Sequence, residues 1–70
     1  MDPLDGRILL AENIRSLAAK RGISIRELAA SAGVSRGYID RVLAGQSSPT
    51  VDWVCKLSQV LSCRPRLLLL

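Results

Sequence analysis

Apolar side chains recur along the first third of the chain with the spacing of an amphipathic helix. Four of them follow one another at steps of four, three and one: Leu10, Ile14, Leu17 and Ala18. These steps place them on one stripe of a helix with about 3.6 residues per turn. The pattern predicts a helix over residues 5–20 that ends at Gly22, and no segment sustains the alternation typical of a strand.

Residues that cap helices divide the middle of the chain into two short helices. Ser24 and Glu27 form a capping-box pattern, in which the hydroxyl accepts the Glu27 N–H while the carboxylate reaches back to the helix start. This pattern predicts a helix that runs to residue 32. Ser35 can cap the next helix, which we expect to end by Gly45.

The last third of the chain carries two further helix starts. Thr50, after a polar loop, is a good N-cap for a helix that continues through Leu61. Pro65 suits the first position of a short final helix that runs to Leu70. Since a chain of 70 residues has room for one small core, the sequence predicts an all-α fold of five helices in a single domain over residues 1–70.

Residues 25–43, IRELAASAGVSRGYIDRVL, have the pattern of two short helices joined by a tight turn. Ala29 is small where the two helices cross closely, and Gly33 suits the positive φ of the turn between them. Four apolar positions can fix the crossing: Leu28, Val34, Ile39 and Val42. This arrangement is the helix-turn-helix pattern, and it spans about residues 24–44.

From about residue 13 to residue 69 the sequence resembles the Cro and phage-repressor (XRE-like) family. The resemblance is carried by four pieces in their order and spacing: NIRSLAAKRGIS, the RELA at 26–29, GVSRGYIDRVLAG at 33–45 and the Pro49-Thr50 helix start. It implies a compact, lambda-repressor-like DNA-binding domain of five helices whose third helix lies in the DNA major groove. We expect residues 50–70 to complete the core and to form the dimer contact.

The resemblance makes residues 35–44 the helix that reads DNA. Its outward stripe holds the base-reading candidates: Arg36, Gly37, Asp40 and Arg41. Arginine can donate two hydrogen bonds to guanine and a carboxylate can accept one from cytosine, so we expect half-sites that contain G·C pairs. The glycine either lets the helix approach DNA closely, which we favour, or contributes nothing to binding. The alternative interpretation is a solvated helix face with an ion pair between Asp40 and Arg36.

The resemblance places the phosphate contacts at helix starts and in the loop before the fourth helix. The candidates are Ser24, Ile25, Arg26, Ser35, Tyr38, Gln46, Ser47, Ser48, Thr50 and Val51. Free backbone N–H groups at a helix start can hold an anion, and the tyrosine hydroxyl can also contact one. Ile25 departs from the family, since relatives usually have a glutamine there that helps to hold a phosphate.

Ala18 and Leu43 depart from the family as a pair. Many relatives have an arginine and a glutamate at these positions, which form a partly buried ion pair. Replacing both partners by apolar residues leaves no unpaired charge and is often neutral or stabilising. We interpret this departure as structural, without consequence for DNA binding.

Trp53 falls where relatives generally show an exposed residue, whereas the usual inward positions hold Val51, Val54, Leu57 and Leu61. We therefore expect a two-fold dimer interface made of Trp53, Val60, Leu67 and Leu70. In the alternative interpretation, Trp53 packs over the loop of the reading helix and the final leucines close the core. A two-fold dimer would read two half-sites of a palindromic operator about one helical turn apart.

The amino-acid composition indicates that the protein binds an anionic partner. It disfavours RNA-binding, metal-binding, enzymatic and membrane-spanning proteins. Ten Lys and Arg against six Asp and Glu give a net charge of +4, concentrated in residues 13–41. With one Tyr and one Trp, a base-stacking RNA surface is disfavoured. With no His and two Cys, the chain lacks a metal ligand set, a catalytic constellation and a cofactor motif, so we expect no enzyme. No apolar run approaches the roughly 20 residues of a membrane span.

The sequence thus predicts a regulator of transcription that binds double-stranded DNA. We expect a homodimeric repressor that covers its operator, located in the cytoplasm and on the nucleoid when bound, with Cys55 and Cys63 reduced. Phage, restriction–modification and toxin–antitoxin contexts stay open, as do RNA polymerase and a toxin as partners. The alternative is an antitoxin or protein-interaction module that keeps the fold with weak or no specific DNA binding.

Overall fold

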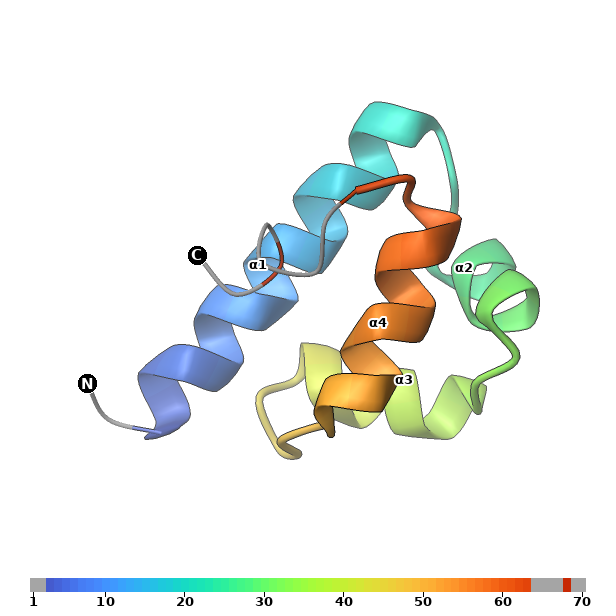
Figure 1. Cartoon of the computed structure of the whole chain (residues 1–70). Helices are drawn as coiled ribbons and strands as arrows, with labels where there is room; N and C mark the ends of the chain where they lie inside the picture. Colours follow the sequence, from blue (N-terminus) through green and yellow to red (C-terminus); the bar gives the residue numbers. More distant parts are fainter. Residues whose placement is uncertain (1–2, 64–67, 69–70) are drawn as a thin grey trace.

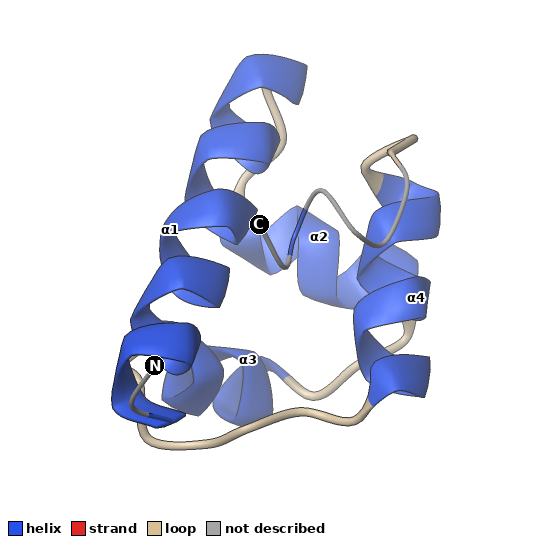
Figure 2. Cartoon of the chain, turned by 60° about the vertical axis from the view of Figure 1, so that its left-hand side comes forward, coloured by secondary structure: helices blue, strands red, loops and turns tan. Residues whose placement is uncertain are grey.

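The computed structural model describes residues 3–63 and residue 68, and within them the chain forms four helices and no strand. The helices are α1 (Pro3–Arg21), α2 (Ile25–Ala32), α3 (Arg36–Leu43) and α4 (Val51–Val60). In Figure 1 the ribbon of α3 passes behind the start of α4, and the most extensive helix packing is of α3 on α1 and of α4 on α2. Figure 2 shows α1 and α4 at opposite sides of the molecule, with α2 and α3 between them.

One apolar core is assembled from all four helices. Its members with almost no exposed surface are Ile14, Leu28, Ile39, Val42, Leu57, Leu61 and Leu68. The stripe predicted for the first helix is confirmed, because Leu10, Ile14 and Ala18 are buried and Leu17 packs against them. The helix-turn-helix pattern is confirmed in the same way, since Leu28, Ala29, Ile39 and Val42 are buried where α2 and α3 meet.

The expected caps start three of the helices. Ser24 accepts the Glu27 N–H at 3.1 Å, Ser35 accepts the Tyr38 N–H at 3.2 Å and Thr50 accepts the Trp53 N–H at 3.2 Å. The Glu27 carboxylate reaches back to the helix start, where its Oε1 accepts a hydrogen bond from the Ser24 hydroxyl at 3.2 Å. Gly33 has a φ of 68°, which lets α2 turn sharply into the segment before α3.

The predicted count of five helices is corrected to four for the residues described. The expected final helix over 65–70 lies outside the described residues, apart from Leu68. That leucine is fully buried, and the Asn13 side-chain amide donates to its carbonyl oxygen at 3.0 Å. Leu68 therefore adds a side chain to the core and is tied to α1.

Two side chains of α4 lie differently from the prediction. Val51 was expected inside but is 71% exposed, because it is the first residue of α4 and lies one turn before Val54, where the buried stripe begins. Trp53 was expected outside but is half-buried and packs against the core. The expected inward positions Val54, Leu57 and Leu61 are confirmed.

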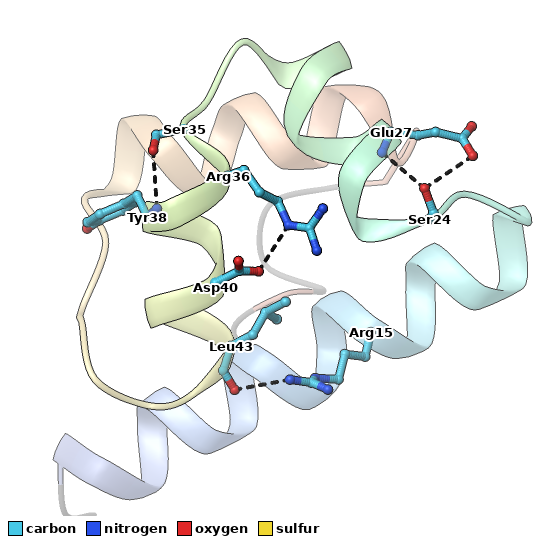
Figure 3. Close-up of polar contacts among 8 residues, drawn as sticks. All are labelled: Arg15, Ser24, Glu27, Ser35, Arg36, Tyr38, Asp40 and Leu43. Atoms are coloured by element: carbon cyan, nitrogen blue, oxygen red, sulfur yellow. Dashed lines mark hydrogen bonds and ion pairs between the residues drawn. The ribbon is translucent and has the colours of Figure 1, made fainter.

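Arginines of α1 tie this helix to the ends of two others. Arg21 donates from Nε to the Leu61 carbonyl oxygen at 2.5 Å and from Nη2 to the Ser62 carbonyl oxygen at 3.2 Å. Arg15 donates from Nη2 to the Leu43 carbonyl oxygen at 3.4 Å (Figure 3). These carbonyls lie at helix ends, where no backbone N–H of the helix can reach them.

Apolar packing replaces the family's ion pair, as predicted. Ala18 is buried at 2% exposure and Leu43 packs against the core. The link between α1 and the end of α3 is made instead by Arg15, one turn before Ala18 on the same helix. Within the part of the chain described, no helix has the length and apolar character needed to cross a membrane.

Candidate nucleic-acid interface

The α3 helix divides into a buried side and an exposed side. Ile39 and Val42 are buried, and Tyr38 and Leu43 pack against the core from its margins. The exposed side is formed by Arg36, Gly37, Asp40, Arg41 and Ala44. We call this surface the α3 face. The predicted inward and outward positions of α3 are therefore confirmed, while DNA contact by the α3 face stays a prediction.

Arg36 and Asp40 form an ion pair along the α3 face. Arg36 Nε lies 3.1 Å from Asp40 Oδ1, and the two side chains are 53% and 55% exposed (Figure 3). A pair at this spacing on an exposed helix contributes about 0.2–0.5 kcal/mol. The pair matches the contact expected for a solvated helix face, and it is weak enough to be exchanged for contacts with a nucleic acid.

Arg41 is held by an aromatic ring instead of a carboxylate. Its guanidinium carbon lies 5.5 Å from the centre of the Tyr38 ring, which precedes it by three residues on α3. The Tyr38 ring meets the Trp53 ring of α4 edge to face, with centroids 5.5 Å apart and planes at 76°. The i, i+3 spacing of Tyr38 and Arg41 could have indicated the first contact. The second depends on how α4 packs and has no local signal.

Gly37 leaves an open position in the middle of the α3 face. A Cβ atom built there would meet only the Ser35 hydroxyl, at an ordinary contact distance of 3.8 Å. The fold therefore does not require glycine at this position. The consequence of the missing side chain is a flatter surface between Arg36 and Arg41.

The phosphate candidates at the helix starts are exposed except for Ile25, and their side chains differ in what they can offer. The hydroxyls of Ser24, Ser35 and Thr50 already accept the cap hydrogen bonds of α2, α3 and α4. Arg26 is an exposed cation in the first turn of α2. Ile25 packs against the core, so that position can offer only its backbone N–H.

The loop between α3 and α4 contains the remaining phosphate candidates. Gln46, Ser48 and Val51 are exposed, while Ser47 is half-buried. Arg7 of α1 donates from Nε to the Ser48 hydroxyl at 2.6 Å, which places a cation beside a loop that has none of its own. The local pattern does not indicate Arg7, because 41 residues separate it from Ser48.

The residues expected at a dimer interface are only partly described. Trp53 and Val60 are half-buried and pack against the core of their own chain, while Leu67 and Leu70 lie outside the described residues. In the alternative interpretation Trp53 packs over the loop of the reading helix, and the structure places its ring against Tyr38 of α3 itself. The dimer interface stays a prediction.

Three solved structures with this arrangement are described as a transcription factor, a controller protein and a gene regulator. A hypothetical transcription factor, NHTF, from Neisseria is 30% identical with a TM-score of 0.89, and the match covers 100% of this chain and 80% of that one. The restriction-modification controller protein C.AhdI from Aeromonas hydrophila is 29% identical with a TM-score of 0.83, covering 89% of this chain and 94% of that one.

A third structure, the clp gene regulator ClgR from Corynebacterium glutamicum, is 27% identical with a TM-score of 0.82, covering 90% of this chain and 67% of that one. No curated protein matches the chain significantly. The family model HTH_3, described as helix-turn-helix, matches residues 14–68, which include α2, α3, α4 and most of the core. The chain therefore belongs to the HTH_3 helix-turn-helix family, the XRE-like class that its sequence resembles.

Proposed function

We propose that this DNA-binding regulator of the HTH_3 family is a homodimeric repressor that recognises a palindromic operator through the α3 face. The observation that carries the proposal is the α3 face itself. Two arginines and no apolar side chain larger than alanine lie on one side of a helix whose other side is locked into the core. Such a helix can enter a major groove as a rigid element.

Arg36 and Arg41 supply the chemistry of base reading in this proposal. Each guanidinium can donate two hydrogen bonds to O6 and N7 of a guanine, and each well-formed pair discriminates by about 1–3 kcal/mol against the wrong base. Asp40 can accept from a cytosine, because the pair with Arg36 engages only its Oδ1 atom. We therefore expect an operator whose half-sites contain G·C pairs.

Phosphate contacts fix the position of the α3 face on the duplex. Arg26 at the start of α2 and Arg7 beside the loop before α4 are cations that flank the helix-turn-helix. The first N–H groups of α4, near Thr50 and the exposed Val51, point out of a helix start that favours anions. These groups contribute affinity that depends on salt and not on sequence.

A homodimer follows from the size of the reading element. One α3 helix of eight residues reaches a single short half-site, and two-fold symmetry doubles the number of base contacts on a palindrome. We place the dimer contact on the side of α4 that carries Val60 and on the final residues Leu67 and Leu70, with Trp53 at its edge. Repression then requires only that the bound dimer covers promoter DNA.

The first experiment is selection of bound sequences from a random duplex pool, followed by binding assays at two salt concentrations. We expect an inverted repeat with G·C pairs whose binding persists at the higher salt. The double variant Arg36→Ala, Arg41→Ala should keep its fold and lose at least about tenfold in affinity for the selected sequence. The matched control is Lys20→Ala, Lys56→Ala, which removes the same charge from exposed positions off the α3 face.

The outcomes separate the proposal from its alternative. If the Arg36→Ala, Arg41→Ala variant binds the selected sequence as tightly as the control variant does, the proposal that the α3 face reads bases is wrong. Failure to enrich any sequence, with weak binding that salt abolishes, would favour an antitoxin or protein-interaction module that keeps this fold. The search would then turn to a protein partner.

A further inference from the structure

We propose that Tyr38 and Trp53 hold the Arg41 guanidinium in place for base reading, so that the Tyr38 ring is a positioning residue that sets specificity at one base pair. The proposal rests on the function proposed for the α3 face. It gives Tyr38 a role through its ring, in addition to the phosphate contact expected of its hydroxyl. Trp53 acts in this proposal within its own chain.

The contacts form a continuous chain from the core to the α3 face. Trp53 packs against the core, its ring meets the Tyr38 ring at 5.5 Å edge to face, and the Tyr38 ring lies 5.5 Å from the Arg41 guanidinium carbon. A guanidinium within about 6 Å of a ring centre is attracted by the ring electrons. Because both rings are half-buried, the Tyr38 ring has a fixed orientation to offer Arg41.

This support leaves the donors of Arg41 unused. Among the described residues the Arg41 side chain has no hydrogen bond and no ion pair. Its contact with the Tyr38 ring attracts the charge without engaging a particular N–H. All five N–H donors of its planar group stay available for the two parallel hydrogen bonds that guanine accepts. Arg36 differs, because its Nε is engaged by Asp40, so that only its Nη donors can reach a base while this pair persists.

The indole nitrogen of Trp53 supports the same interpretation. Trp53 Nε1 is buried and has no hydrogen-bond partner among the described residues. A buried donor without a partner is unfavourable, so the orientation of the indole is set by its ring contacts and not by a hydrogen bond. The ring contact that reaches the surface is the one with Tyr38.

The first test uses the free protein, so its result does not depend on whether the proposed function is right. Proton NMR of the Arg41 Hδ and Hε atoms should show upfield ring-current shifts in the wild type and in Tyr38→Phe. Tyr38→Leu should abolish these shifts and leave those of Arg36 unchanged. Arg41 protons at ordinary positions in the wild type would overturn the proposal, whether or not Tyr38→Leu folds.

The second test measures specificity on the selected operator and on a panel of single base-pair changes. Tyr38→Leu should lose about two- to fivefold of the discrimination at the base pair read by Arg41, which matches the strength of an exposed cation–ring contact. Tyr38→Phe should keep this discrimination. In the Arg41→Ala background, Tyr38→Leu should cause little further loss of discrimination at that base pair. The base pair read by Arg36 serves as the internal control.

The outcomes of the second test are distinct. If Tyr38→Phe and Tyr38→Leu weaken binding equally to every sequence, the hydroxyl contact with phosphate accounts for Tyr38 and the ring has no role in specificity. If Trp53→Leu folds and keeps full discrimination at the Arg41 base pair, the second ring is dispensable and the chain of contacts is wrong. Absence of any selective binding by the wild type would instead reject the proposed function.

Discussion

Gly37 is a residue of the α3 face that the fold itself does not require. Glycine within a helix is less stable than alanine by roughly 0.5–1 kcal/mol, and the open space at Gly37 means that the fold gains nothing from it. A glycine that the fold does not require, in the centre of a surface proposed to enter a groove, is consistent with close approach to DNA.

We expect Gly37→Ala to raise the free energy of unfolding by up to about 1 kcal/mol and to weaken operator binding. The matched control is Gly6→Ala, since Gly6 lies within α1 and its added Cβ would meet nothing within 4 Å, whereas a Cβ at Gly37 would make one ordinary contact with the Ser35 hydroxyl. That variant should gain stability without loss of affinity. Denaturant unfolding and operator titrations measure both quantities. If Gly37→Ala binds the operator as tightly as the wild type does, the absence of a side chain at this position is not needed for DNA binding.

Ser62 is the one described residue other than glycine with a positive φ, at 52°. It directly follows the Leu61 cap of α4, where helices commonly end in a left-handed residue that is usually glycine. Ser62→Gly should therefore stabilise the protein by about 0.5–1 kcal/mol, because glycine adopts this conformation without steric penalty. Ser31→Gly, at an exposed helical position of α2, should destabilise it. Thermal unfolding of the two variants decides the sign.

At the scale of elements, short-range patterns predict α2 and α3 well. Ser24, Ser35 and Gly33 act within three or four residues along the chain, so their roles can be read from sequence. Contacts between distant segments cannot be read in this way. The core packing of Trp53 and the exposure of Val51 depend on where α4 lies against α2 and α3, which no local spacing encodes.

The candidate site likewise has features that local sequence patterns predict and features that depend on contacts between distant segments. The exposed arginines of the α3 face follow from helical periodicity and the family resemblance, and their exposure is confirmed. The partners that orient them have different origins. The pairing of Arg36 with Asp40 is local, and the sequence predicts it, whereas the contact of Trp53 with Tyr38 and the approach of Arg7 to Ser48 require the folded chain.

The end of α4 gives an element-scale prediction. Arg21 satisfies the carbonyl oxygens of Leu61 and Ser62 from α1. Arg21→Ala should lower the free energy of unfolding by about 1 kcal/mol, since two carbonyls lose a charged donor. Lys20→Ala is the control, because this neighbouring cation is exposed at the same helix end and makes no such contact among the described residues. If both variants lose the same free energy of unfolding, the effect comes from the positive charge at the end of α1 and not from the hydrogen bonds of Arg21.

At the scale of the whole molecule, the proposed dimer determines how strongly binding depends on salt. A dimer that neutralises about six to eight phosphates should show a slope of roughly −5 to −7 for log K against log salt. A single subunit makes half of these contacts and should show about half of this slope. Salt dependence therefore reports the number of subunits that act together on DNA.

The variant Val60→Lys distinguishes binding by a dimer from binding by a single subunit. Val60 is half-buried on α4, and a lysine there would place like charges across a two-fold contact. We expect this variant to sediment as a monomer and to bind with about half of the wild-type salt slope. Gln59→Lys adds the same charge at the adjacent exposed position and should keep the dimer. If Val60→Lys folds and sediments like Gln59→Lys at every concentration, the contact lies on another surface, because a charge buried between two subunits would have separated them.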